Sequence, residues 1–418
     1  MKNKTKLPKV LFVGDKWCSA NFQWGLAEWE GNLWKSLKAT GLADLMLFHF
    51  DDYYYRFKKL GDEALIKKIT KYQPDIICLV IYRIPGSDFS VPKWETFDII
   101  KNRFKIPIIA IWGDMESPET VRLYKSFILY ITISAATATS AAINRLNISE
   151  KCMYMWAPKD PTIFNNPQKK RDIDVSYVGS GRENRLERVN YLIKNGIDVD
   201  IRGGESEEHL STKKYADIFQ RSKITLSFSR ARYSHVINAR PFEAMNCGAM
   251  VLEEEGFETP KLFTPFVDYV PYTSNRDLFE KTRYYLSHDT ERERIAENGY
   301  KKTSKLYTSK RFWKLMIGRA LKTSTQNTNN LLFLKPSNLS HLSHWKRFKF
   351  RFLDSLCSNS LGFKLYKTYM IIFVKSDWDD ELRKVIFPIY LFFQKNLPPK
   401  KFEKSLKILR FIFGIKKK

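Results

Sequence analysis

The feature that most constrains the fold is an alternation of strand and helix patterns that occurs twice along the chain. Before about residue 155, short apolar runs predict strands at Val10–Val13, Leu45–Phe50, Ile76–Ile81 and Ile106–Ile111. Helical periodicity lies between them, over about 24–39, 62–72 and 94–103. Strands that alternate with helices in this way predict a parallel sheet covered by helices.

The alternation stops at residues 157–171, which hold three prolines and predict a hinge, and then starts again. The elements expected after the hinge are a helix at Arg185–Lys194 and strands at 174–178, 199–201, 224–228 and 249–252. The prediction is therefore an α/β protein with two doubly wound domains, 1–156 and 172–320, followed by a separate tail at 331–418. A length of 418 residues suits this division.

The composition describes a globular, strongly basic protein. With 44% hydrophobic and 28% charged residues, it excludes a disordered chain and a coiled coil. Lys and Arg outnumber Asp and Glu by 71 to 45, a formal net charge of +26. Such a surface favours anionic partners, namely nucleotides, phosphorylated lipids, acidic membranes or nucleic acid.

Cysteine usage and hydropathy indicate a cytoplasmic protein. The 5 cysteines are scattered, with neither a Cys-x-x-Cys motif nor a nearby pair of histidines, which predicts buried thiols in a reducing compartment. Val10–Val13 is too short for a signal-peptide core, and no stretch approaches the roughly 18 apolar residues of a membrane span.

In doubly wound sheets, ligands bind at the carboxyl ends of the strands. In the second domain the first such loop contains Gly179, Gly181 and Arg182, which suit close approach of a phosphate and its neutralisation. A nicotinamide dinucleotide is a weaker alternative, because Asn184 occupies the place of the third glycine of that fingerprint.

The most informative segment is 223–256, where a strand precedes a short helix that carries Arg240 and Glu243. A carboxylate there can accept hydrogen bonds from a ribose diol while arginine neutralises a diphosphate. The alternative is an ion pair between positions i and i+3 on the helix surface. The expected nucleotide-binding residues are Gly179, Gly181, Arg182, Arg230, Arg240, Glu243, Glu254 and Gly256.

On the first domain, the candidate residues follow predicted strands. Asp15, His49 and Asp114 end strands, and Asp114 precedes a Ser-Pro helix start, so it is a candidate general base for deprotonating a hydroxyl group. For each of the three, a structural role is the alternative. The sequence also has two Asp-x-Asp pairs, which begin strands at the wrong edge for chemistry, so no metal site is predicted.

From Asp174 to about Phe312 the sequence resembles bacterial group 1 nucleotide-sugar glycosyltransferases, specifically the spore-maturation-protein-like branch. The resemblance rests on a Val-Gly-Ser-Gly turn, on Arg240-Pro-Phe-Glu243 through Gly248, and on Asn298-Gly-Tyr300. It implies the GT-B fold, in which two Rossmann-like domains face a cleft, with the donor on the second domain and the acceptor on the first.

The resemblance also implies roles for particular residues. Glu243 matches the acid that binds the donor ribose, while Arg182 and Arg230 fall near the diphosphate. Retaining members carry a Glu eight residues before the ribose-binding one, where this chain has His235, so both stereochemical outcomes stay open. The family needs no metal, and arginines can stabilise the departing diphosphate. The expected catalytic residues are Asp114, Arg230 and Arg240, with a UDP- or GDP-linked sugar as co-substrate and no cofactor.

Residues 331–418 form a basic, aromatic-rich tail with 19 Lys or Arg against 6 Asp or Glu. Apolar residues at 402, 406, 409 and 413 predict an amphipathic helix suited to an anionic membrane interface. Packing against the second domain is an equal alternative, and nucleic-acid binding a weaker one.

The leading prediction is a glycosyltransferase that acts peripherally at the inner face of the membrane on a cell-surface glycan or lipid-linked acceptor. The alternative is a non-catalytic GT-B-like scaffold or a nucleic-acid-binding protein that uses the basic tail.

Overall fold

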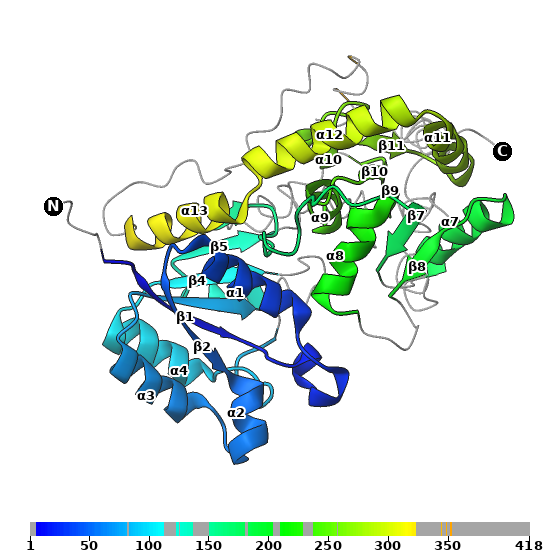
Figure 1. The fold of residues 1–418 in the computed structure, drawn as a ribbon. Coiled ribbons are helices and arrows are strands. Elements are labelled where there is room, and N and C mark those ends of the chain that lie inside the picture. Colours follow the sequence, from blue (N-terminus) through cyan, green and yellow to red (C-terminus); the bar gives the residue numbers. More distant parts are fainter. Residues whose placement is uncertain are drawn as a thin grey trace, which may run out of the picture.

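The structure is a computed structural model (Figure 1). It describes residues 6–81, 83–112, 123–124, 126–136, 150–179, 183–203, 210–228, 237–256 and 258–322, together with residues 344, 348 and 352. The predictions for Asp114, Gly181, Arg182, Arg230, His235 and nearly all of the tail lie outside these residues.

The first domain contains a six-stranded parallel sheet in the order β2-β1-β3-β4-β5-β6. Its strands are β1 (Lys9–Gly14), β2 (Asp44–His49), β3 (Ile76–Ile81), β4 (Ile108–Trp112), β5 (Ile133–Ala136) and β6 (Cys152–Tyr154). Its helices are α1 (Glu28–Thr40), α2 (Phe50–Phe57), α3 (Asp62–Tyr72) and α4 (Trp94–Asp98), which continues as a π-helical segment, Ile99–Phe104. Every residue of β4 is buried, as expected for a central parallel strand.

The strand and helix predictions for this domain agree closely with the structure. The strand at 76–81 and the helix at 62–72 match exactly. The helix predicted from residue 24 begins only at Glu28, because Phe22–Trp24 form a separate 3₁₀ turn that ends at Gly25 with φ +78°. The sequence did not predict α2, β5 or β6.

The second domain contains a five-stranded parallel sheet in the order β11-β10-β9-β7-β8. The strands are β7 (Ile173–Val178), β8 (Asp200–Arg202), β9 (Ser222–Ser227), β10 (Met250–Glu254) and β11 (Val270–Tyr272). The helices are α7 (Glu183–Lys194), α8 (Thr212–Arg221), α9 (Arg240–Asn246), α10 (Thr259–Leu262), α11 (Asn275–Ser287), α12 (Asp289–Leu306) and α13 (Ser309–Lys322).

Helix α13 returns from the second domain to the first, where it lies over the sheet beside α1 (Figure 1). The indole of Trp313, which is fully buried, donates a 2.8 Å hydrogen bond to the hydroxyl of Ser36 on α1. At the start of α13, the hydroxyl of Ser309 accepts a 2.9 Å hydrogen bond from the backbone N–H of Lys159. The chain therefore crosses between the domains at two adjacent places.

A side-chain contact links the carboxyl sides of the two domains. Helix α1 follows β1 and α8 follows β8, so each begins at the carboxyl edge of its own sheet. The hydroxyl of Thr212 in the first turn of α8 donates a hydrogen bond to the carboxylate of Glu28 in the first turn of α1. The loops in which ligands of doubly wound sheets bind thus lie on facing sides of the two domains.

Candidate functional site

On the second domain, the site is built on the short helix α9. Its backbone begins where the side chain of Asn238 accepts a 2.9 Å hydrogen bond from the N–H of Arg240, and Pro241 occupies the first turn, where it is tolerated. The helix ends at Asn246, and Gly248, two residues later, turns the chain with a φ of +78° that suits glycine. These signals place Arg240 and Glu243 in one turn at the amino end of the helix.

Glu243 is a buried carboxylate and not half of a surface ion pair. It is 8% exposed, and one carboxylate oxygen accepts a 2.7 Å hydrogen bond from the hydroxyl of Tyr215 on α8. Burial raises the pKa of Glu243, against the opposing effects of that hydrogen bond and of the positive charges on Arg240 and Lys159. A carboxylate held in this way keeps lone pairs for a further donor.

Arg240 lies against the glycine turn that follows β7. A Cβ added at Gly179 would lie 2.5 Å from Nη2 of Arg240, so only glycine leaves room for the guanidinium. The same guanidinium lies 5.9 Å from the centre of the Tyr177 ring. Its Nε is buried, and no group in the described part of the chain accepts a hydrogen bond from it. A second glycine turn, at Gly203, packs on the backbone of Gly179.

Glu254, expected on the donor side, ends β10 as a buried residue. Its carboxylate lies 2.8 Å from the guanidinium of Arg188 on α7. The guanidinium of Arg188 in turn lies 5.9 Å from the centre of the Phe228 ring and 5.8 Å from that of Tyr272. Gly256 follows two residues later and is buried. The structure thus gives Glu254 a charged partner in a largely apolar setting, at the same sheet edge as Gly179.

Lys159 joins the interdomain segment to α9. Its ammonium is buried and donates a 2.9 Å hydrogen bond to the carbonyl of Phe242, one residue before Glu243. Burial lowers the pKa of Lys159 to about 8, against the effect of the Glu243 carboxylate. The segment between the domains therefore contributes a positive charge beneath the donor side.

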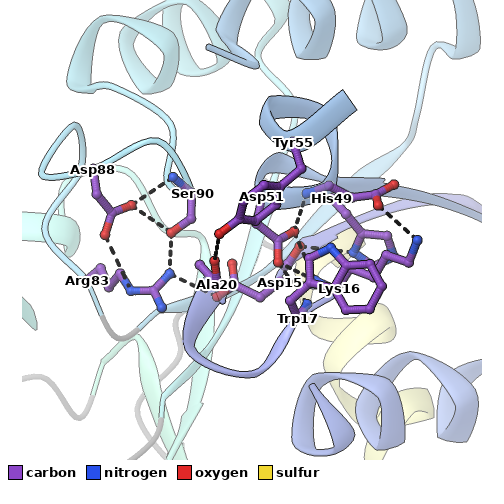
Figure 2. A network of polar contacts seen from close by, with 12 residues as sticks. Asp15, Lys16, Trp17, Ala20, His49, Asp51, Tyr55, Arg83, Asp88 and Ser90 are labelled. Carbon is purple, nitrogen blue, oxygen red and sulfur yellow. Dashed lines mark hydrogen bonds and ion pairs between the residues drawn. The ribbon is translucent and has the colours of Figure 1, made fainter. Parts of the chain in front are cut away.

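On the first domain, Figure 2 shows a polar network at the carboxyl ends of β1 and β3. The guanidinium of Arg83 lies 2.9 Å from the carboxylate of Asp15 and 3.6 Å from that of Asp88. It also donates a hydrogen bond to the hydroxyl of Ser90, which bonds Asp88 at 2.7 Å. We call these four residues, Asp15, Arg83, Asp88 and Ser90, the acceptor-edge network.

His49 and Asp51 hold the loop after β1. The imidazole Nδ1 of His49 lies 3.0 Å from the carbonyl oxygen of Gly14. Asp51, fully buried in the first turn of α2, accepts hydrogen bonds from the backbone N–H groups of Lys16 at 3.0 Å and Trp17 at 2.8 Å. Of the predicted acceptor-side residues, Asp15 and His49 therefore lie at one edge, and His49 contacts backbone.

Glu30 is a buried carboxyl near this network that was not predicted from sequence. It lies in the first turn of α1 and is 8% exposed. Burial raises the pKa of Glu30 to about 7, with Asp15 adding to the rise and Arg83 opposing it. A carboxyl with such a pKa can take up and release a proton near neutrality.

Three of the four Asp-x-Asp aspartates form ion pairs near strand starts. Asp172 lies 2.7 Å from Arg221, Asp174 lies 2.6 Å from Lys223, and Asp200 lies 2.5 Å from Arg202. Within the described ranges, no three His, Cys, Asp or Glu side chains are grouped as metal ligands. In the same ranges, no helix has the length and hydropathy needed to cross a membrane.

Among families of known proteins, one matches the second domain. Residues 170–318 match the model of a family described as glycosyl transferase-like, which agrees with the region of resemblance found in the sequence. A search of curated proteins found no match.

Solved structures show the fold. Crystal structures of Alr3699/HepE from Anabaena are similar in complex with UDP and glucose (TM-score 0.50, 13% identity) and in complex with UDP-glucose (TM-score 0.50, 12% identity). The matches cover 76% and 74% of this chain, and 100% and 98% of those chains. The fold is GT-B, with two parallel-sheet α/β domains, as predicted.

Proposed function

We propose that this protein is a glycosyltransferase that takes its sugar from a nucleotide-sugar donor. One observation carries the proposal. In the segment that matches the glycosyl transferase-like family, the buried Glu243 and the partly buried Tyr215 and Arg240 form one group beside the Gly179 turn, at the carboxyl edge of the second sheet. That edge is where doubly wound domains bind nucleotides.

The residues of this group suit different parts of a nucleotide. Glu243, oriented by Tyr215, would accept hydrogen bonds from the ribose diol. Arg240, with its Nε available, would pair with the diphosphate and stabilise its negative charge as it departs. We propose that Gly179, Gly181, Arg182 and Arg230 complete the diphosphate site, with Glu254 and Gly256 near the sugar. The Anabaena structures with UDP and UDP-glucose make UDP the first nucleotide to test, followed by GDP.

We propose that the first domain holds the acceptor. Asp15 and His49 lie at its carboxyl edge, and Asp114 remains the predicted base for the acceptor hydroxyl. Glu30 is a second candidate for that base. With arginines to balance the diphosphate, transfer needs no metal, and turnover that is unchanged in EDTA is the expected result.

The proposed setting is the cytoplasmic face of the membrane, where the protein binds peripherally and modifies a cell-surface glycan or lipid-linked acceptor. The support is the charge of residues 331–418, 19 basic against 6 acidic. Replacing Lys400, Lys404, Lys407 and Arg410 with Gln in the full chain should weaken sedimentation with phosphatidylglycerol vesicles. Unchanged sedimentation would refute anchoring by this segment.

Donor turnover tests the proposed activity. The purified protein is incubated with UDP-glucose, and then with GDP-mannose, and nucleotide release is measured for the wild type and for Glu243→Ala. Because Glu243 would make charged hydrogen bonds worth about 1.5–3 kcal/mol each, turnover at subsaturating donor should fall at least about tenfold. Glu297→Ala removes a glutamate on α12 that pairs with Lys301 at 3.3 Å, and should leave turnover unchanged.

Equal turnover by the Glu243→Ala and wild-type proteins would overturn the site assignment. Tight, salt-sensitive RNA binding without any response to nucleotide sugars would instead favour the nucleic-acid-binding alternative.

A further inference from the structure

An aromatic cluster joins the segments that follow β1, β2 and β3 at the carboxyl edge of the first sheet. Phe22, in the loop after β1, lies edge-on to Tyr55 of α2, with ring centres 5.0 Å apart. Tyr54 of α2 stacks on Phe89, in the loop after β3, at 4.3 Å, and Tyr55 meets Phe89 at 5.6 Å. We call Phe22, Tyr54, Tyr55 and Phe89 the aromatic cluster.

The cluster keeps apolar surface in contact with solvent. Phe22 is 53% exposed, and Trp24 on the same short turn is 57% exposed. Two exposed aromatic side chains on one short turn add apolar surface, and such a group marks a binding surface more often than a lone exposed residue does. The hydroxyl of Tyr55 donates a 3.0 Å hydrogen bond to the carbonyl of Ala20, which fixes the loop that carries Phe22.

The acceptor-edge network lies beside the aromatic cluster. Figure 2 shows Tyr55 and Ala20 next to Asp15, Arg83, Asp88 and Ser90. Phe89 lies between Asp88 and Ser90 in sequence, so one loop contributes to both groups. A small cavity of about 30 Å³ adjoins the network and is lined in part by Asp15, Arg83 and Ser90. It has room for one or two groups the size of a water molecule or a hydroxyl.

The two groups together present aromatic faces next to fixed hydrogen-bonding groups. A pyranose ring needs both, because its axial C–H bonds form an apolar face and its equatorial hydroxyls form a polar rim. A lipid chain would cover the charged network without forming hydrogen bonds to it, at a cost in desolvation. A phosphate would meet Asp15 and Asp88 as well as Arg83, since the network holds two carboxylates and one guanidinium.

We propose that the aromatic cluster and the acceptor-edge network form a subsite for an uncharged sugar ring, the acceptor end of a glycan. A ring would pack on Phe22 and its neighbours while its hydroxyls bond to Asp88, the most exposed carboxylate of the network at 38%. The inference rests on the proposed function, because it assigns the acceptor class to the domain opposite the donor side. A lipid chain as occupant is an outcome of the test.

The test is saturation-transfer NMR on the full-length protein with saturating UDP. The probes are methyl α-glucoside, methyl β-galactoside, methyl α-mannoside, methyl N-acetyl-β-glucosaminide and octyl β-glucoside. We expect at least one probe to receive saturation on its ring protons. Phe22→Ala should weaken binding of that probe about fivefold or more. Phe57→Ala is the control. Phe57 is similarly exposed, at 58%, and lies on α2 beyond the cluster, so its removal should leave the affinity for the probe unchanged.

A second variant tests the polar half of the subsite. Arg83→Lys keeps the charge but cannot bridge Asp15, Asp88 and Ser90 as the guanidinium does, so it should also weaken binding. The midpoint of urea unfolding for each variant shows that it is folded.

Three results would overturn the inference: no probe binds, saturation reaches only the alkyl protons of octyl glucoside, or Phe22→Ala binds like Phe57→Ala. The thermal response to UDP, measured separately, distinguishes this failure from failure of the proposed function. Phe22→Ala should keep that response. If the wild type itself shows no thermal response to UDP, that result refutes the donor site alone.

Discussion

At the scale of single residues, the proposed donor site would depend on the contact between Gly179 and Arg240. The glycine has φ +153°, which other residues rarely adopt, and a Cβ there would lie 2.5 Å from Nη2 of Arg240. The backbone conformation and the space both require glycine. The guanidinium of Arg240 therefore occupies the space that a side chain at position 179 would fill.

Gly179→Ala should displace the Arg240 guanidinium and weaken nucleotide binding by about tenfold or more, since it disturbs a charged contact. Gly196→Ala is the matched control, because Gly196 has φ +84° but no atom within 4 Å of an added Cβ. It should cost about 1 kcal/mol of stability through backbone strain and leave nucleotide affinity unchanged. Titration calorimetry with UDP measures both, and equal affinities for the two variants would argue against a role for Arg240.

The polar residues of the site were predictable only where local sequence carries their signal. Arg240 and Glu243 lie in a short recognisable motif. Tyr215, which orients Glu243, is 28 positions away, and Arg83 meets Asp15 across 68 positions. A single sequence does not reveal such pairings, because they arise from the order of strands in the sheets.

Glu30 gives the protein a defined dependence of stability on pH. Its pKa is about 7 in the folded state against 4.5 ordinarily, so the folded protein binds the proton more tightly. The stabilisation is fully present below pH 4.5 and is lost as the pH rises through 7, where the carboxylate stays charged while buried. At about 1.4 kcal/mol per pH unit, the difference comes to about 3 kcal/mol.

Glu30→Gln should therefore stabilise the protein at pH 8 by up to about 3 kcal/mol and have little effect at pH 4.5. Urea unfolding of both proteins from pH 4.5 to 8 measures the difference, in which all other titrating groups cancel. A gap that does not change with pH would contradict the buried, proton-binding character of Glu30.

At the scale of elements, α13 is the part of the second domain's chain that stabilises the first. It packs on α1 and on strands β3, β4 and β5, and Trp313 is its fully buried anchor. The hydroxyl of Ser36 accepts from the Trp313 indole and itself donates to the carbonyl of Leu33 at 2.6 Å. Both polar groups are thereby satisfied inside an apolar contact.

Trp313→Ala should destabilise the protein by about 3–5 kcal/mol, the usual cost of removing a large buried aromatic side chain. Leu321→Ala, at a position 48% exposed on the same helix, should change stability by no more than about 0.5 kcal/mol. Urea unfolding of the full chain compares the two. Similar small losses would show that α13 contributes little to holding the first domain.

Periodicity predicted most elements but not their partners. The apolar run at Ile76–Ile81 is long enough to identify a buried strand, and the structure has the same bounds. In contrast, β6 has only 3 residues, too few for a periodic signal. Nor does the pattern of α13 say which sheet it covers, since the same apolar face fits either one.

At the scale of the whole molecule, the account requires two sites that face one another. The donor group around Glu243 and the acceptor-edge network lie on different sheets, both at carboxyl edges. The contact between Thr212 and Glu28, together with the two crossings at Lys159 and Ser309, joins the domains on those sides. The resemblance predicted the two-domain fold because it concerns topology, whereas the aromatic cluster depends on loops that carry no shared motif.

The most direct test of the central claim is the thermal unfolding of the full-length protein with UDP and with GDP, using Glu243→Ala for comparison. A nucleotide at about 100 times its dissociation constant adds about 2.7 kcal/mol, which should raise the midpoint by several degrees. The account predicts that one nucleotide raises the midpoint of the wild type and that this rise is lost in Glu243→Ala. A rise of equal size in both proteins, or no rise with either nucleotide, would contradict it.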